Sequence, residues 1–192
     1  IYVATDYVGL GTVGPHPYLI GEGEARLALD SIRALRQMEG IRAGDDTVVW
    51  GHSQGGHAAL WTGIVAPNYA PDVNILGVAA IAPASDLPSL INAIQATPVG
   101  RIMSAFVLRS YAAAYPDVEF DEYVPGWKRW LANDISGRCL AGREALFSVG
   151  EAFLAGGSIF DRAPTSGPFG ERLAENTPSG PLRQPLLIAQ GL

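Results

Sequence analysis

Trp50-Gly51-His52-Ser53-Gln54-Gly55-Gly56 is the stretch that decides the fold. It follows Thr47-Val48-Val49, which favours a buried strand, and it precedes the small-residue segment 57–64, which favours a helix. A strand, the pattern Gly-x-Ser-x-Gly and a helix are together typical of a nucleophile elbow. In such an elbow the serine occupies a strained turn that exposes its hydroxyl at the end of a sheet. The stretch therefore predicts an α/β fold in which Ser53 is a nucleophile.

The residues around Ser53 also predict how developing negative charge is held. The backbone N–H of Gln54 lies at the start of the predicted helix, where the helix dipole favours an anion, so Gln54 is a predicted oxyanion donor. We expect glycine at positions 51 and 55 because a side chain there would collide with the neighbouring strand and helix. The simpler alternative, a glycine-rich turn with an incidental serine, does not account for a third glycine at position 56.

The composition is that of a compact globular protein, with 192 residues, 48% of them hydrophobic and 17% charged. The net charge of −6 argues against nucleic acid as a partner and against electrostatic docking on an anionic membrane. No apolar stretch is long enough for a transmembrane helix, and residues 1–5 favour a strand rather than a signal peptide. We expect no cofactor. Cys139 is the only cysteine, which excludes a cysteine-based metal site and leaves a buried free thiol or half of a disulfide whose partner lies outside this chain.

Predicted strands and helices alternate in the first half of the chain. Apolar residues at helical spacing, Ala25, Leu29, Ile32 and Leu35, predict an amphipathic helix. The predicted strands are 1–5, 47–50, 73–82 and 186–190, and the predicted helices are 21–38 and 54–65. This alternation predicts right-handed crossovers and a mostly parallel sheet with helices on both faces. The apolar run 73–82 is typical of a parallel strand that is covered on both faces.

Residues 87–183 have a different pattern, with no clear core strand. Their apolar residues recur at spacings closer to helical: Ile91, Ile94, Ile102, Phe106, Trp127, Trp130, Leu131, Leu146, Phe147 and Phe153. We expect a helical cap or lid, inserted between core segments 1–86 and 184–192, with most of these residues filling the cap's own core. Because the chain opens in one predicted strand and stops just after another, we expect it to be an internal segment of a longer protein.

A serine hydrolase also needs a base and an acid that orients the base. In this topology the chain order is nucleophile, acid, histidine, yet the only histidines are His16, His52 and His57. His57 is expected to pack against the sheet or loops, and His16 is expected to lie in a loop that could border the site. The acid and the histidine are therefore expected beyond residue 192. Asp86 is the alternative acid, although a helix N-cap explains it as well.

Three segments resemble the secretory lipase family, which comprises fungal lipase A enzymes and bacterial relatives. They are Tyr2-Val3-Ala4-Thr5-Asp6-Tyr7-Val8-Gly9-Leu10-Gly11, the helix that begins Gly21-Glu22-Gly23-Glu24-Ala25-Arg26, and Val49 to Ala59 around the elbow; Pro185 to Gly191 resembles the family's strand before its catalytic aspartate. The resemblance is close over 1–86 and 184–192 and weak between them. It implies an α/β-hydrolase with a helical cap that acts on carboxylic esters, with an extracytoplasmic location.

The same resemblance implies roles for individual residues. Ser53 matches the nucleophile, Gln54 supplies a backbone oxyanion donor, and Asp6 matches an aspartate that completes the oxyanion hole. Asp6 can do so only if it is protonated or contributes its backbone N–H, since an ionised carboxylate repels an oxyanion. The alternative is that Asp6 only caps its loop.

Two functions from different classes follow. In the first, Ser53 attacks the carbonyl of an acyl ester or lipid and forms an acyl-enzyme, with the acyl chain in a tunnel lined by Phe106, Trp127 or Phe153 and a lipid interface contacting the cap. Thioesterase, acyltransferase and peptidase reactions use the same groups. In the second, the chain is a non-catalytic binding module that kept the elbow and lost the triad.

Overall fold

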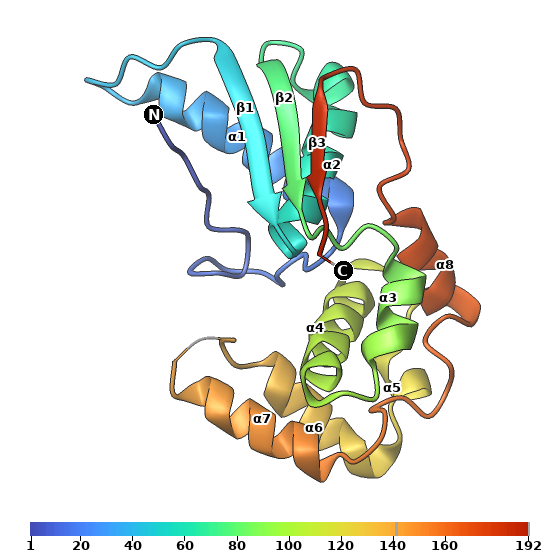
Figure 1. Ribbon diagram of the computed structural model, residues 1–192. Coiled ribbons are helices and arrows are strands. Elements are labelled where there is room, and N and C mark those ends of the chain that lie inside the picture. Colours follow the sequence, from blue (N-terminus) through green and yellow to red (C-terminus); the bar gives the residue numbers. More distant parts are fainter. Residues whose placement is uncertain (141, 192) are drawn as a thin grey trace. The chain divides into compact units, whose positions relative to one another are not determined.

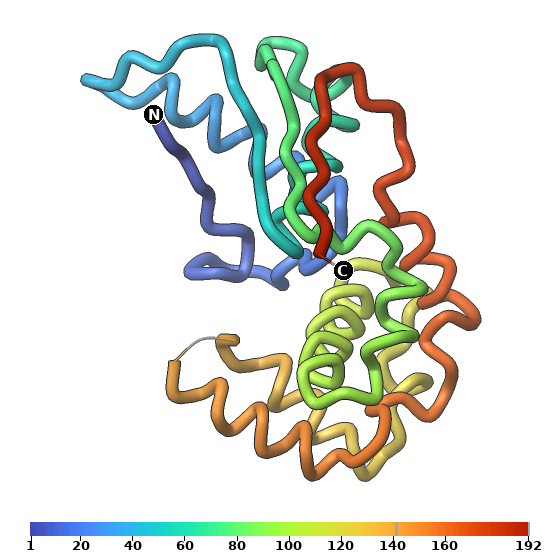
Figure 2. Tube along the Cα trace, viewed as in Figure 1, coloured from blue at the N-terminus to red at the C-terminus, as the bar shows by residue number. Residues whose placement is uncertain are grey.

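A parallel three-stranded sheet forms the centre of one of two units in the computed structural model, which describes residues 1–140 and 142–191 (Figure 1). The core unit comprises Ile1–Ser85 and Asn176–Leu192, and the helical unit comprises Asp86–Glu175. The strands are β1 (Asp46–His52), β2 (Asn74–Ile81) and β3 (Leu186–Ala189), in the order β1-β2-β3. Figure 2 shows β3 beside β2 although more than a hundred residues separate them in sequence.

The sheet carries its hydrophobic core on the face covered by two helices. Helix α2 (Gln54–Tyr69) packs on β1 and β2, and helix α1 (Gly21–Gln37) packs on α2. Both helices were predicted, and α2 continues past its predicted end through Pro67. The core contains Leu29 and Ile32 of α1, Ala59 and Leu60 of α2, and Ile75, Val78 and Ala80 of β2. Strand β2 alternates between buried and exposed side chains, so the described residues cover one face of its apolar run.

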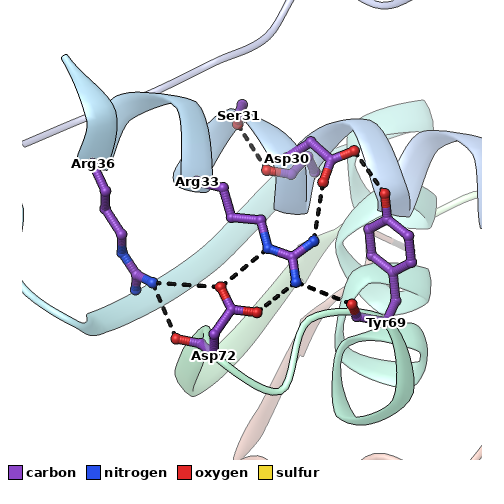
Figure 3. A network of polar contacts seen from close by, with 7 residues as sticks. Asp30, Ser31, Arg33, Arg36, Tyr69 and Asp72 are labelled. Atoms are coloured by element: carbon purple, nitrogen blue, oxygen red, sulfur yellow. Dashed lines mark hydrogen bonds and ion pairs between the residues drawn. The ribbon is translucent and has the colours of Figure 1, made fainter.

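A network of polar contacts fixes α1 to the turn between α2 and β2 (Figure 3). The Arg33 guanidinium donates to both carboxylate oxygens of Asp72, at 3.0 and 2.5 Å, and to the Tyr69 carbonyl at 3.1 Å. Tyr69 in turn donates its hydroxyl to Asp30 of α1 at 2.7 Å. The guanidinium holds the pKa of the Asp72 carboxyl below its usual value. This bidentate geometry holds α1 in register with α2, and therefore with the residue that begins α2.

Residues 1–5 do not form the predicted strand. They are drawn as coil in Figure 1, although the Tyr2 ring lies 6.2 Å from that of Trp50 on β1. A cavity of about 490 Å³ is lined by these residues together with β1 and α1. The apolar pattern is a local property, whereas strand pairing needs a partner at ladder distance. The prediction was therefore wrong about pairing at this edge.

The regular secondary structure in the described residues of the second unit is all helical, as the spacing of apolar residues predicted. Its helices are α3 (Leu87–Ile94), α4 (Pro98–Ala114), α5 (Phe120–Tyr123), α6 (Gly126–Ser136), α7 (Glu144–Leu154) and α8 (Gly167–Glu175). Helix α4 is central and contacts each of the other five. Buried Arg101 of α4 donates to the carbonyls of Ala96, Ala152 and Gly157, which ties α7 and the loop after it to α4.

Two expectations for this unit were wrong. Five of the apolar residues assigned to its core are exposed, namely Trp127, Trp130, Leu146, Phe147 and Phe153, whereas Ile91, Ile102 and Leu131 are buried. Cys139 is an exposed free thiol in the described chain rather than a buried one. Helical spacing identifies an apolar stripe but not what covers it.

No helix of the described residues is long and apolar enough to span a membrane.

Candidate active site

Ser53 occupies the single-residue turn between β1 and α2. Its backbone has φ 56° and ψ −116°, in the positive-φ region that L-residues seldom adopt. The end of β2 fixes the turn, because the Ser53 N–H donates to the Ile81 carbonyl at 2.9 Å. The Ser53 carbonyl accepts from the N–H of His57 at 3.1 Å and of Ala84 at 3.3 Å. The side chain is exposed and does not cap α2, so its hydroxyl is available to a reactant.

The glycines of the elbow have different reasons to be glycine. A Cβ on Gly51 would lie 2.1 Å from the Gly55 carbonyl oxygen, so the approach of α2 to β1 requires glycine there. A Cβ on Gly56 would lie 3.0 Å from Pro83, which is also tight. A Cβ on Gly55 would meet nothing within 4 Å, so the expected collision at that position was wrong. The backbone of Gly55 lies close to Gly51 of β1, but a side chain on Gly55 would point into open space.

Gln54 and Asp6, the two predicted oxyanion donors, differ in their surroundings. Gln54 is the first residue of α2, so its backbone N–H has no acceptor within the helix and lies at the positive end of the helix dipole. Asp6 is exposed, and its carbonyl accepts from the Thr5 hydroxyl at 3.1 Å. Among the described residues, no hydrogen bond joins Asp6 to Ser53 or Gln54.

The three histidines lie around the elbow, and none of them contacts the Ser53 hydroxyl within the described chain. His57 is fully buried, as predicted, with its Nδ1 2.8 Å from Glu24. His52 is exposed. His16 lies between the Tyr7 and Tyr18 rings, at centroid distances of 5.7 and 5.8 Å. Burial lowers the pKa of His16 despite the opposing effect of the Glu24 carboxylate.

Asp86, the alternative acid, caps the first helix of the helical unit. Its carboxylate accepts from the Ser89 N–H at 3.1 Å. Hydrogen bonding from the Ser89 side chain, and then from its backbone, lowers the pKa of Asp86. The geometry is that of an N-cap, which is the simpler of the two explanations offered by the sequence.

One buried side chain near the elbow was not singled out from the sequence. Glu24 of α1 is completely buried and contacts both Gln54 and His57. No local pattern identifies it, because its position in the first turn of α1 is also where an exposed glutamate would favour the helix dipole.

Comparisons with known proteins give the family of the chain. The secretory lipase family matches residues 1–160. Lipase 6 of Candida albicans is 27% identical over 154 residues, which cover 74% of this chain and 32% of that protein. A secreted triacylglycerol lipase of Malassezia globosa is 34% identical over 101 residues, covering 52% of this chain and 22% of that one. The chain thus spans about a third or less of the length of these curated relatives.

Two solved structures share the fold at low sequence identity. Candida antarctica lipase A in its closed state has a TM-score of 0.69 and 20% identity, over 90% of this chain and 42% of that one. The rice cell wall degrading esterase LipA of Xanthomonas oryzae has a TM-score of 0.73 and 19% identity, over 95% of this chain and 53% of that one. Both likenesses show an α/β-hydrolase fold. With the family match over most of its length and a strained serine at the β1–α2 turn, the chain belongs to the secretory lipase family.

Proposed function

We propose that the protein containing this chain hydrolyses carboxylic esters through an acyl-enzyme on Ser53. The observation that carries the proposal is the strained, exposed serine between β1 and α2. The N–H directly after it belongs to a helix N-terminus and has no acceptor within that helix. Strain of this kind persists where the surrounding structure enforces it, and it is concentrated at functional sites. Membership of the secretory lipase family supports the reaction class.

The reaction begins when the Ser53 hydroxyl adds to the ester carbonyl and gives up its proton to a histidine base. The carbonyl oxygen becomes an oxyanion, which the Gln54 N–H and a second donor from Asp6 stabilise. Each donor contributes on the order of 3 kcal/mol to lowering the barrier. When the tetrahedral intermediate collapses, the alcohol leaves with a proton from the histidine. Water then hydrolyses the acyl-enzyme and releases the carboxylic acid product. Asp6 serves through its backbone N–H or a protonated carboxyl, and the acid and histidine come from sequence outside these 192 residues.

The substrate class is an acyl ester or lipid, since the curated relatives are named lipases. The exposed apolar side chains of α6 and α7 support contact of the helical unit with a lipid surface, and Trp127, Trp130 and Phe147 are each more than half exposed. Of the three residues predicted to line an acyl-chain tunnel, Phe106 is partly buried on α4, whereas Trp127 and Phe153 are exposed. Phe106 is therefore the better candidate for the tunnel wall. We assign the helical unit, Asp86–Glu175, to the predicted cap over the site. We place the protein outside the cytoplasm, as the name of the Malassezia relative suggests.

The test uses the full-length protein and a fluorophosphonate probe, which phosphonylates an activated serine. Wild type is expected to be labelled on the peptide that contains Ser53 and to hydrolyse p-nitrophenyl esters. Ser53→Ala is expected to lose labelling and to lower kcat on the order of 10⁶-fold, because the nucleophile carries the whole covalent route. Ser31→Ala is the matched control, since among the described residues the hydrogen bond of the Ser31 hydroxyl is to the Ala28 carbonyl within α1. A folded wild type that is neither labelled nor active would instead indicate a non-catalytic module.

A further inference from the structure

A buried carboxylate beneath the elbow has no role in the reaction described above. Glu24 is completely buried in the core unit, one turn into α1. Burying a carboxylate is costly unless hydrogen bonds and a countercharge compensate it. The partners of Glu24 therefore indicate what the buried carboxylate does in the fold.

The two oxygens of Glu24 together contact the residue Leu19 before α1 and two side chains in the first turn of α2. Oε1 accepts from the Leu19 N–H at 3.0 Å and from Nε2 of Gln54 at 2.7 Å. Leu19 has φ 57°, so one of these bonds stabilises a strained residue just before α1. The other oxygen, Oε2, lies 2.8 Å from Nδ1 of His57. The carboxylate thus joins the start of α1 to the first turn of α2.

His57 fixes the orientation of this carboxylate. Nε2 of His57 lies 2.8 Å from the Asn176 carbonyl, which can only accept, so Nε2 carries a proton. The contact between Nδ1 and Oε2 then holds one further proton, and the pair is neutral overall whichever atom bears it. The Asn176 side chain in turn accepts from the Gly21 N–H at 2.9 Å, which closes the network around the start of α1.

The Gln54 side chain connects the Glu24 carboxylate to the loop of Asp6, the other predicted oxyanion donor. Its side-chain amide has two hydrogens, one directed at Glu24 and the other at Nε2 of His16, 3.4 Å away. His16 stacks on Tyr7, the residue directly after Asp6. A chain of contacts therefore runs from Glu24 through Gln54 and His16 to the loop that carries Asp6.

We propose that Glu24 is a positioning residue for the oxyanion hole. It holds the Gln54 side chain, and thereby the backbone N–H of Gln54 and the loop that carries Asp6, in the geometry that the transition state requires. The inference rests on the proposed function. Oxyanion donors stabilise the transition state only when they are already in place, and a displacement of about 1 Å costs on the order of 10²-fold in rate.

The decisive variant is Gln54→Met in the full-length protein. It removes the amide that Glu24 holds, keeps a side chain of similar length and leaves the backbone N–H in place. We expect kcat per labelled active site to fall about 10–100-fold while KM for a p-nitrophenyl ester stays within about 2-fold. Counting sites with the fluorophosphonate probe separates this loss from a loss of folded protein.

Glu24→Leu tests the carboxylate itself, and Glu24→Gln is its conservative partner. A glutamine at 24 can accept from Leu19 and Gln54 and donate to Nδ1 of His57, so it should recover most of the kcat that Glu24→Leu loses. In the double variant with Gln54→Met, Glu24→Leu should add little further loss, because both act on one contact.

Two outcomes overturn the inference while Ser53 is still labelled in wild type. One is Gln54→Met with wild-type kcat, which decides the matter even if Glu24→Leu does not fold. The other is a double variant whose losses in kcat multiply, which would make Glu24 a structural residue acting independently of Gln54. Failure of the proposed function is distinguishable, since wild type itself would then be unlabelled.

Discussion

Two glycines of one elbow are expected to respond in opposite directions to the same substitution. A Cβ on Gly51 would lie 2.1 Å from the Gly55 carbonyl oxygen and 2.2 Å from its carbon, so backbone must move by about 1 Å to reach ordinary contact. The obstacle is the first turn of α2, and no side chain can rotate out of the way. Overpacking of this kind costs about 3 kcal/mol at the upper end of its usual range.

Gly55→Ala is the matched control, four residues further along the same motif. A Cβ there meets nothing within 4 Å, and Gly55 lies in the first turn of α2, where alanine is favoured over glycine by about 0.5–1 kcal/mol. The two variants should therefore differ by roughly 4 kcal/mol in the free energy of unfolding, which sums those two figures.

Thermal melts of the full-length variants provide the measurement. We expect Gly51→Ala to melt roughly 5–10 °C below Gly55→Ala and to lose esterase activity, because the shift of α2 displaces the Gln54 N–H relative to Ser53. If Gly51→Ala had the melting temperature of wild type, the close approach of α2 to β1 would not be the reason for glycine at that position.

Two further predictions concern groups whose pKa values are shifted. Asp86→Ala should destabilise the protein by about 1 kcal/mol through loss of the cap on α3, whereas Asp86→Asn should melt close to wild type with normal kcat; loss of kcat in Asp86→Asn would make Asp86 a catalytic acid instead. The pKa of His16 is lowered from its ordinary 6.5, so the neutral form stabilises the folded protein fully above pH 6.5, and this contribution is lost as the pH falls through the lowered value. Melts of wild type and His16→Gln between pH 5 and 8 should therefore show wild type losing its advantage on the acid side, and the opposite trend would refute the assignment.

Local sequence was sufficient for the elements that short-range spacing specifies. The elbow, the helices on either side of it and the helical character of residues 86–175 depend on turns and periodicities within a few residues. The N-cap at Asp86 belongs to the same class, because its acceptor and donor are three residues apart. Ser53 could be proposed as a nucleophile from the sequence because the Gly-x-Ser-x-Gly pattern and the strand and helix beside it lie within a few residues of one another.

Contacts between distant residues were decided by tertiary structure alone. Three features depend on which residues lie alongside in space. They are the lack of strand pairing at residues 1–5, the exposure of Trp127 and Cys139, and the burial of Glu24. Glu24 shows the reason most clearly: its partners, Gln54 and His57, are 30 and 33 residues away. The helical pattern of α1 places Glu24 near the helix start, but a glutamate there satisfies the helix whether it is exposed or buried. Only the packing of α1 on α2 brings Glu24 into contact with Gln54 and His57 at the elbow.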